Sequence, residues 1–130
     1  MASQRHPGSC GRFGVDLVDV DRFRHSLTRT PGLRDRLFLP EEQEYSERQS
    51  DPTERYAARF AAKEAVLKAL GLGLGSVSFQ DIEIVHTVSG EPALRLHSKA
   101  IDIASEAGVE KWLLTLTHTH RTAAAVAVAL

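Results

Sequence analysis

The order of the expected elements predicts a single α+β domain. Strand-forming and helix-forming segments follow one another as strand, helices, hairpin, helix and hairpin, whereas a doubly wound parallel sheet alternates strands and helices regularly. The chain has 130 residues, of which 42% are hydrophobic and 25% charged. A chain of this length and composition can bury one core without disulfides or structural metal. We therefore expect one domain over residues 13–130.

Residues 1–12 are interpreted as a flexible N-terminal extension. They are mostly polar or glycine, and they lack the apolar core of a signal peptide. Cys10 is the only cysteine of the chain. A single cysteine excludes an internal disulfide and is typical of the reducing cytoplasm, where we expect the protein.

Charge and hydropathy argue against two kinds of partner. The formal net charge of -1 is not that of a protein held to nucleic acid by a broad basic surface. No apolar run approaches the roughly 20 residues that a membrane-spanning helix needs. The apolar segment at residues 123–130 is interpreted as a buried terminal strand. We expect neither nucleic acid nor membrane as a partner.

The first half of the chain is predicted to form one strand followed by helices. Residues 13–20 are rich in β-branched side chains, and their alternation places Asp16 on the same face as Val18 and Val20. Aspartate is depleted in strands, so its presence here needs a reason. Helical segments are expected at residues 21–29, at 33–38 and from Pro40 to about residue 50.

The strongest helix signal of the chain covers residues 53–70. Thr53 is expected as its N-cap, and Gly71 is well placed to end it. The remaining expected elements are a strand pair at residues 77–87 and 93–97, a helix at 99–107 closed by Gly108, and a final strand pair at 112–119 and 122–130.

The long helix is expected to be covered on two sides. At about 100° per residue, Tyr56, Phe60 and Leu67 share a stripe that also contains Glu64. The opposite side permits another element to approach closely, because its residues are small: Ala58, Ala62, Ala65 and Ala69. Glu64 and Lys68 would then be partly buried, which is costly unless charges are paired or bind a metal. An ordinary ion pair on the helix surface is the alternative.

Asp16 and Glu64 together would make a site for a hard cation. Mg²⁺ typically takes one or two protein carboxylates plus waters and substrate phosphates. An aspartate in a strand can instead cap a nearby helix or accept from a backbone amide. The sequence leaves open whether the two carboxylates converge.

Three further features each have a structural and a functional interpretation. The glycine-rich loop at residues 71–75 either ends the helix or lets a phosphate or planar ring approach. His118 and His120 share a strand face and are either structural or a two-histidine metal pair without a clear third ligand. The basic residues near the first helix form a solvated face or dock an acidic protein: Arg22, Arg24, Arg29, Arg34 and Arg36.

Taken in order, four segments resemble the holo-acyl-carrier-protein synthase family of small 4'-phosphopantetheinyl transferases. GVDLVDVDR at residues 14–22 resembles the family's glycine-x-aspartate strand and arginine-bearing helix. RFAAKEAVLK at residues 59–68, with the glycine loop after it, is similar to the family's lysine-glutamate-x-x-x-lysine helix. Residues 78–84 resemble the hairpin that follows, and residues 116–119 with the last strand resemble the C-terminal end.

The sequence departs from the family pattern at three places. Family members usually start almost at the first strand, and His120 is not a hallmark of the family. Residues 35–55 match poorly, so contacts with the carrier are not carried over to them.

The resemblance implies a fold, an activity and an assembly. The fold would be the 4'-phosphopantetheinyl transferase-like α+β fold, a small antiparallel sheet with a long central helix and further helices, in a homotrimer with sites at the subunit interfaces. The enzyme would transfer 4'-phosphopantetheine from coenzyme A to a serine of an apo acyl carrier protein, with Mg²⁺ as cofactor, and 3',5'-adenosine bisphosphate would leave. Carriers of fatty-acid, polyketide and peptide synthesis all remain open.

The resemblance also implies roles for individual residues. Asp16 and Glu64 would bind Mg²⁺ and, with Lys68, form the catalytic set, in which Glu64 is the first choice as general base and Asp16 the second. Arg22 and Arg29 would dock the acidic recognition helix of the carrier protein. The residues expected to bind coenzyme A are Arg59, Lys63, Gly71, Gly73, His118 and Thr119.

Two other functions are compatible with these residues. A non-catalytic trimeric module could bind a nucleotide or a carrier protein, with Asp16 and Glu64 purely structural. A different coenzyme A-dependent transferase could act on small molecules. Mg²⁺-dependent release of adenosine bisphosphate separates the first alternative from the enzyme, and dependence on a carrier protein separates the second.

Overall fold

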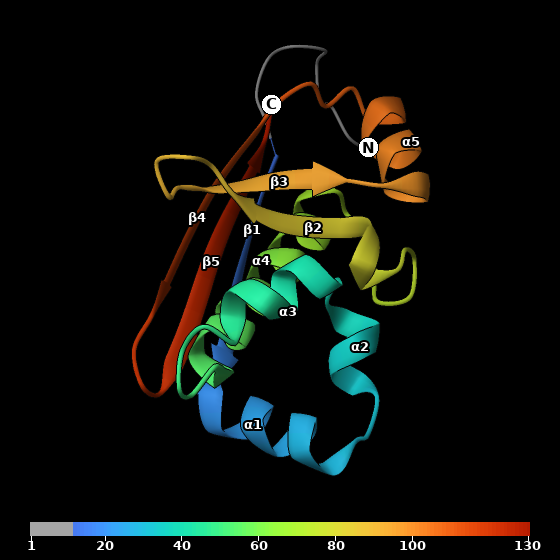
Figure 1. Cartoon of the computed structure of the whole chain (residues 1–130). Helices are drawn as coiled ribbons and strands as arrows, with labels where there is room; N and C mark the ends of the chain where they lie inside the picture. Colours follow the sequence, from blue (N-terminus) through green and yellow to red (C-terminus); the bar gives the residue numbers. More distant parts are fainter. Residues whose placement is uncertain (1–11) are drawn as a thin grey trace.

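The structure, a computed structural model, describes residues 12–130 and consists of a three-stranded sheet, a strand pair and helices. The three strands of the main sheet are antiparallel in the order β1–β5–β4, with β1 at Arg12–Asp19, β4 at Trp112–His118 and β5 at Thr122–Ala129. The long helix α4 (Thr53–Ala69) packs against one face of this sheet (Figure 1). A second antiparallel pair joins β2 (Ile82–His86) to β3 (Pro92–Leu96). The predicted α+β class is confirmed.

Three short helices connect β1 to α4 and follow one another in an arc, coloured blue to cyan in Figure 1. They are α1 (Val20–Arg29), α2 (Leu33–Leu37) and α3 (Pro40–Ser46), and a later helix, α5 (Ser98–Glu106), precedes β4. Asp19 caps α1 by accepting the Arg22 amide at 3.0 Å. Each helix lies where the sequence predicts one, with ends shifted by a few residues.

Two predicted boundaries are wrong, and local polar contacts explain both. The strand expected from residue 77 begins only at Ile82, because a 3₁₀ turn, η1 (Phe79–Asp81), precedes it. The Ser78 hydroxyl starts this turn by accepting the Gln80 amide at 3.2 Å. The N-cap of α4 is Pro52 and not Thr53, whose own amide donates to the Asp51 carboxylate at 3.2 Å.

Gly14 lets β1 and α4 approach each other closely. A Cβ at this position would lie 1.9 Å from the Ala65 carbonyl oxygen and 2.8 Å from the Ala69 nitrogen. Both alanines are buried and belong to the small-residue side of the helix. The expectation that another element approaches this side is confirmed, and that element is β1. The inward-facing side chains of β1, Asp16 among them, therefore lie directly against α4.

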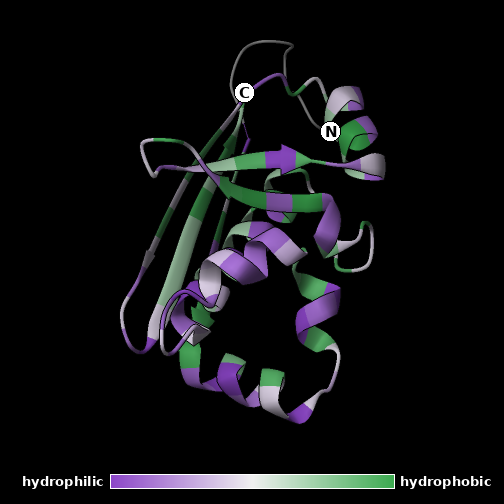
Figure 2. Cartoon of the chain, in the orientation of Figure 1, coloured by the Kyte–Doolittle hydropathy of each residue, from purple (hydrophilic) through white to green (hydrophobic). Residues whose placement is uncertain are grey.

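The main sheet has one face against α4 and an exposed apolar face. On the inner face Asp16 stands in register with Ala125 and Leu116. On the outer face Phe13, Val15 and Leu17 are 67%, 55% and 69% exposed. Figure 2 shows hydrophobic residues along most of β5, the central strand. Such an exposed apolar face on a folded chain indicates an interaction surface.

Residues 1–11 of the expected N-terminal extension, including Cys10, lie outside the described residues. Arg12, its last expected residue, instead begins β1. In the part of the chain that the structure describes, no helix combines the length and the apolar character required to cross a membrane.

Candidate active site

Asp16, Glu64 and Lys68 meet where β1 crosses α4. Lys68 Nζ donates to Asp16 Oδ1 at 2.8 Å and to the Val15 carbonyl at 3.1 Å. Glu64 lies one helical turn before Lys68, and its carboxyl group is close enough to Asp16 for the two carboxylates to influence each other. The two carboxylates whose convergence the sequence leaves open are thus brought together, and Lys68 pairs with the strand aspartate.

Burial raises the pKa of Glu64 to about 7, and the neighbouring Asp16 carboxylate adds to this increase. The nearby Lys68 ammonium acts in the opposite direction. The hydrogen bond to Asp16 also raises the pKa of Lys68, which therefore remains a cation. A carboxyl group that titrates near neutral pH has the property required of a general base, since it is both available and basic enough to take a proton.

The donor set at this crossing fits a magnesium ion. Asp16 Oδ2 is buried and lacks a hydrogen-bond partner among the described residues, and a buried polar atom without a partner is costly. Carboxylate oxygens are the protein ligands that Mg²⁺ prefers, and Glu64 supplies a second group. Within residues 12–130, no cluster of three or more His, Cys, Asp or Glu side chains is arranged to hold a metal ion. A cation here would draw its other ligands from water and substrate phosphates.

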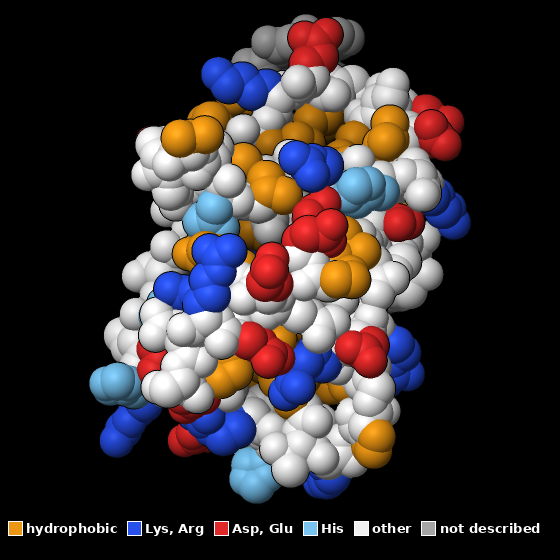
Figure 3. Space-filling view, in the orientation of Figure 1, with side chains coloured by type: hydrophobic (Ala, Val, Ile, Leu, Met, Phe, Trp, Pro, Cys, Tyr) orange, Lys and Arg blue, Asp and Glu red, His pale blue; other side chains and the backbone are white. Residues whose placement is uncertain are grey.

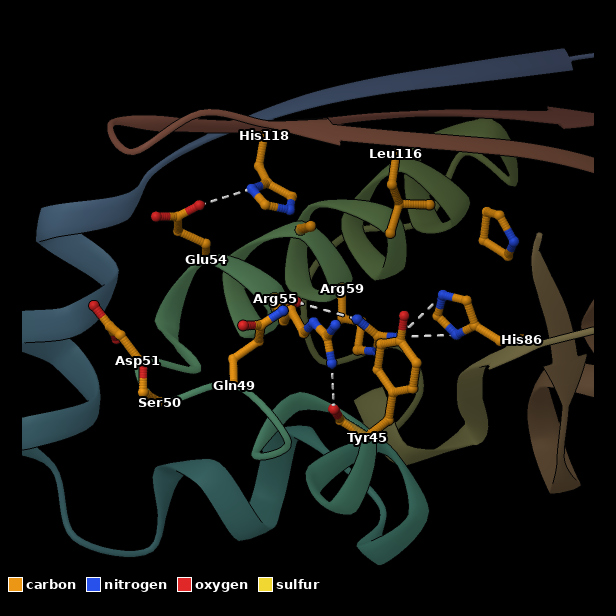
Figure 4. A pocket seen from close by; sticks show the side chains of 12 residues that line it. Tyr45, Gln49, Ser50, Asp51, Glu54, Arg55, Arg59, His86, Leu116 and His118 are labelled. Carbon is orange, nitrogen blue, oxygen red and sulfur yellow. Dashed lines mark hydrogen bonds and ion pairs between the residues drawn. The ribbon is translucent and has the colours of Figure 1, made fainter. Parts of the chain in front are cut away.

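A pocket of about 490 Å³ opens beside α4, between the segment that follows α3 and the end of β4 (Figure 4). Arg59 is a buried charged residue of the pocket wall. It is 2% exposed, and its guanidinium lies 4.2 Å from the centre of the Tyr45 ring. Arg59 also donates to His86 Nδ1 at 3.0 Å, while its buried Nε has no partner in the described chain. Arg55 lies over the same tyrosine ring at 4.4 Å. The pocket wall therefore carries two guanidinium groups, which can bind an anion, together with the carboxylates of Asp51 and Glu54.

His118 lines the same pocket from the end of β4. Its Nδ1 lies 2.9 Å from Glu54 Oε1, and Nδ1 of His120 lies 2.9 Å from Glu54 Oε2. Figure 4 shows the His118 ring projecting from the strand toward Glu54. Sequence reasoning missed Glu54, because a glutamate in the first turn of a helix is explained by the helix dipole alone. It missed Tyr45 for another reason, since that residue lies in the segment that matches the family poorly.

Lys63 is directed away from the pocket and from Asp16. The side chain is fully buried, and its ammonium donates to Glu42 Oε1 at 2.9 Å and to the carbonyls of Phe79 and Ile82 at 2.8 and 2.7 Å. Glu42 Oε2 in turn accepts the Ile84 amide at 2.8 Å. All three ammonium protons have partners within the chain, so contact of Lys63 with coenzyme A stays a prediction.

The other residues expected to bind coenzyme A lie in two turns. Gly71 and Gly73 belong to the loop after α4, where no described atom lies within 4 Å of the position that a Cβ would take. Gly71 has φ +72°, a conformation that suits glycine at a helix end. Thr119 is in the β4–β5 turn, where its hydroxyl accepts the amides of Arg121 and Thr122 at 3.1 Å.

Helix α1 presents Arg22 and Arg29 to solvent. Arg24, between them, is instead paired with Asp51 at 2.8 Å. Over the range 12–130 neither Arg22 nor Arg29 forms an ion pair. Figure 3 shows basic and acidic side chains intermixed over the face that carries α1 to α3.

Comparison with known proteins assigns the chain to a family. Residues 12–129 match the family model of the 4'-phosphopantetheinyl transferase superfamily. The match covers nearly all of the described residues, including strand β1 with Asp16 and helix α4 with Glu64. The chain therefore belongs to the 4'-phosphopantetheinyl transferase superfamily.

Within the superfamily the chain is similar to holo-acyl-carrier-protein synthases. It is 46% identical over 115 residues to the holo-[acyl-carrier-protein] synthase of Moorella thermoacetica, covering 88% of this chain and 90% of the relative. The corresponding protein of Frankia alni is 46% identical over 116 residues, with coverage of 89% and 93%.

Solved structures of such synthases share the fold. The Neisseria meningitidis enzyme matches with a TM-score of 0.83 at 30% identity, over 92% of this chain and 97% of that one. The Helicobacter pylori enzyme in complex with coenzyme A matches with a TM-score of 0.80 at 28% identity, over 91% and 99%. The family resemblance and the fold predicted from it are confirmed.

Proposed function

We propose that the protein transfers the 4'-phosphopantetheine group of coenzyme A to a serine of an apo acyl carrier protein. Family membership supports this reaction, as do the names of the relatives and the coenzyme A complex of the Helicobacter pylori synthase. The observation that carries the proposal is the meeting of Asp16, Glu64 and Lys68 at one point of the chain. Two carboxylates and an ammonium at one point suit phosphoryl transfer, in which the protein mainly positions reactants and offsets charge.

In the proposed reaction the serine oxygen attacks the β-phosphate of coenzyme A. The bond from that phosphorus to the leaving oxygen breaks, and 3',5'-adenosine bisphosphate departs. Glu64 accepts the serine proton, directly or through a water molecule. Lys68, oriented by Asp16, offsets the negative charge that develops on the phosphate. Asp16 and Glu64 would hold Mg²⁺, which when bound neutralises phosphate charge and stabilises the leaving oxygen.

The pocket that Arg55 and Arg59 line is proposed to take the nucleotide part of coenzyme A. Arg59 and His118 would lie at its 3'-phosphate, supported by the burial of one and the position of the other on the pocket wall. Gly71 and Gly73 would lie beside the adenosine. Arg22 and Arg29 would receive the acidic helix of the carrier protein, because both are exposed cations without ion pairs inside residues 12–130.

A homotrimer is proposed as the working assembly, with its active sites at the subunit interfaces. The outer face of the main sheet supports this assembly, because it exposes Phe13, Val15 and Leu17 on β1 and Leu113 on β4. Phe13 and Leu113 are both in register with Val128 of the central strand, so they share one surface. A second copy of the same chain would cover this apolar area.

The test is intact-mass spectrometry of an apo acyl carrier protein incubated with this protein, coenzyme A and Mg²⁺, with an EDTA control. We expect a gain of one phosphopantetheine group that EDTA prevents, with release of adenosine bisphosphate. If several carriers gain no mass while the folded protein binds coenzyme A, the non-catalytic binding module is favoured instead. Modification of a small-molecule acceptor without any carrier would favour the other coenzyme A-dependent transferase.

A further inference from the structure

One carboxylate on α4 holds two histidines of the β4–β5 hairpin. Glu54 Oε1 is 2.9 Å from Nδ1 of His118, and Oε2 is 2.9 Å from Nδ1 of His120. The hydrogen bond to His120 is the largest cause that lowers the pKa of Glu54, and the bond to His118 acts in the same direction. An ionised carboxylate only accepts hydrogen bonds, so both imidazoles donate their Nδ1–H to Glu54.

This contact determines what His118 can offer to a ligand. His118 lines the pocket, and its Nδ1–H donates to Glu54. Only the other ring nitrogen, Nε2, is therefore left for a ligand. A neutral imidazole protonated at Nδ1 has only a lone pair at Nε2, which repels an anion. The ring presents a donor to an anion only when it carries both protons.

We propose that Glu54 is a positioning residue, which makes binding of the 3'-phosphate of coenzyme A depend on protonation of His118. This inference rests on the proposed function, since it assumes that the nucleotide occupies this pocket. Glu54 touches no reacting atom and acts only through the tautomer of the histidine. The preference of the pocket for a 3'-phosphorylated nucleotide is therefore strongest when His118 is an imidazolium and declines as the pH rises.

The other charged groups around the pocket do not mimic this dependence. Arg55 and Arg59, from α4, stay cationic across the range in which histidine titrates. Asp51, in the preceding loop, has a pKa lowered by its hydrogen bond to the Thr53 amide and stays ionised. Burial and the nearby guanidinium groups lower the pKa of His86, on β2, so it stays neutral. His120 is the remaining group, and its side chain is 97% exposed and lies outside the pocket lining.

The experiment is calorimetric titration of the full chain with 3',5'-adenosine bisphosphate and with 5'-AMP, from pH 6.5 to 8.5. The measured quantity is the ratio of the two dissociation constants, which reports the 3'-phosphate alone. In the wild type we expect the preference for the bisphosphate to fall by up to about tenfold per pH unit, the limit for one proton. In Glu54→Gln the amide can donate to Nδ1, which leaves a neutral ring with Nε2–H toward the pocket. The preference should then hardly change with pH.

Two controls separate positioning from a structural role. His120→Ala removes only the exposed partner of Glu54 and should keep the wild-type pH profile, and so should Glu106→Gln on the remote helix α5. The ionisation of the nucleotide is the same for every variant and cancels in the comparison. Circular dichroism and a thermal melt confirm that each variant is folded, and His118→Asn provides a second variant in which the pH dependence should vanish.

The outcomes are distinguishable from failure of the proposed function. Parallel profiles for the wild type and Glu54→Gln, or equal weakening of both nucleotides, overturn the inference while carrier modification continues. A wild type that modifies the carrier but does not prefer the bisphosphate overturns it as well. A wild type that neither binds nucleotide nor modifies a carrier overturns the proposed function together with the inference.

Discussion

Lys68 on α4 donates a 2.8 Å hydrogen bond to Oδ1 of Asp16 on β1, and this ion pair leaves Oδ2 of the same carboxylate buried without a partner in the described structure. One oxygen is thus held by the helix, and the other remains available to a cation. The two members of the pair act oppositely on Glu64, because Asp16 raises the pKa of that carboxyl group and Lys68 lowers it. The first predictions follow from this geometry.

Glu64→Gln should abolish most transfer to the carrier and leave the fold intact. The amide keeps the size of the side chain but can neither accept a proton nor bind Mg²⁺ as a carboxylate. We expect kcat to fall by roughly 10²-fold or more, as for the loss of a general base. Mass spectrometry of the carrier measures the rate, and the thermal melt checks folding. A variant that keeps nearly the wild-type rate with Mg²⁺ would remove Glu64 from the catalytic set.

The stability of the metal-free protein should decrease between pH 4.5 and about pH 7. The folded state keeps a proton on Glu64 up to about pH 7, whereas the unfolded chain loses it near the ordinary value of 4.5. Stability is therefore fully present below that window and is lost as the pH rises through it. Mg²⁺ affinity should increase over the same window, because the metal competes with the proton. Thermal melts in EDTA measure the stability, and melts with added Mg²⁺ report the metal affinity. Glu64→Gln should remove the loss of stability between pH 4.5 and about 7. If the stability of the variant decreases with pH as steeply as that of the wild type, the assignment is contradicted.

Gly14→Ala should destabilise the protein by about 3 kcal/mol or more, because a Cβ would meet backbone atoms that cannot rotate away. The nearest is the Ala65 carbonyl oxygen at 1.9 Å. Gly73→Ala is the matched control, since Gly73 has no described neighbour within 4 Å of its added Cβ, and it should change stability by less than about 0.5 kcal/mol. Urea denaturation measures both. If the urea midpoints of Gly14→Ala and Gly73→Ala are equal, β1 and α4 can move apart and the close approach does not require glycine.

Arg22→Glu should raise KM for the carrier protein more than KM for coenzyme A. The substitution reverses a charge on the proposed docking helix. Charges at the edge of an interface mainly affect the association with a charged partner. Lys111→Glu, an exposed lysine just before β4, is the control for net charge. Steady-state kinetics with each substrate varied in turn gives the comparison. Equal increases in the two KM values would argue against docking on α1.

Leu17→Glu should dissociate the proposed homotrimer. Leu17 is 69% exposed on the outer face of the main sheet, and a glutamate there would be buried without a partner in any assembly that covers this face. Light scattering after gel filtration measures the mass of the particle. Ile101→Glu, at another exposed apolar residue on α5, should leave the mass unchanged. If the wild type is a monomer at micromolar concentration, this face is not the subunit interface.

Periodicity and small-residue patterns were sufficient to predict most of the fold. The alanines on one side of the long helix indicated a close approach, and Gly14 is the residue that makes it possible. The start of β2 could not be predicted, because Ser78 and its hydroxyl contact with Gln80 compete locally with the strand that the apolar pattern favours.

The site was partly predictable, because carboxylates in unusual places carry a signal. Asp16 was identified because aspartate is unusual in a strand, and Glu64 because it lies in an apolar stripe of its helix. Lys63 showed the limit of this reasoning: its side chain ends among Glu42 and two carbonyls contributed by other elements. Periodicity within one helix contains no information about such tertiary partners. The partners of Glu54 were equally out of reach, since its two histidines come from the β4–β5 hairpin.

The buried Lys63–Glu42 pair also bears on the edge of the smaller sheet. A pair of strands presents free backbone edges, which can recruit strands from other molecules and start aggregation. Glu42 Oε2 accepts the Ile84 amide at 2.8 Å, so a helix side chain occupies an outward donor of β2. The carboxylate stays in place because Lys63 neutralises its charge in the core. The ion pair thus keeps this backbone donor of β2 unavailable to a strand of another molecule in the folded chain.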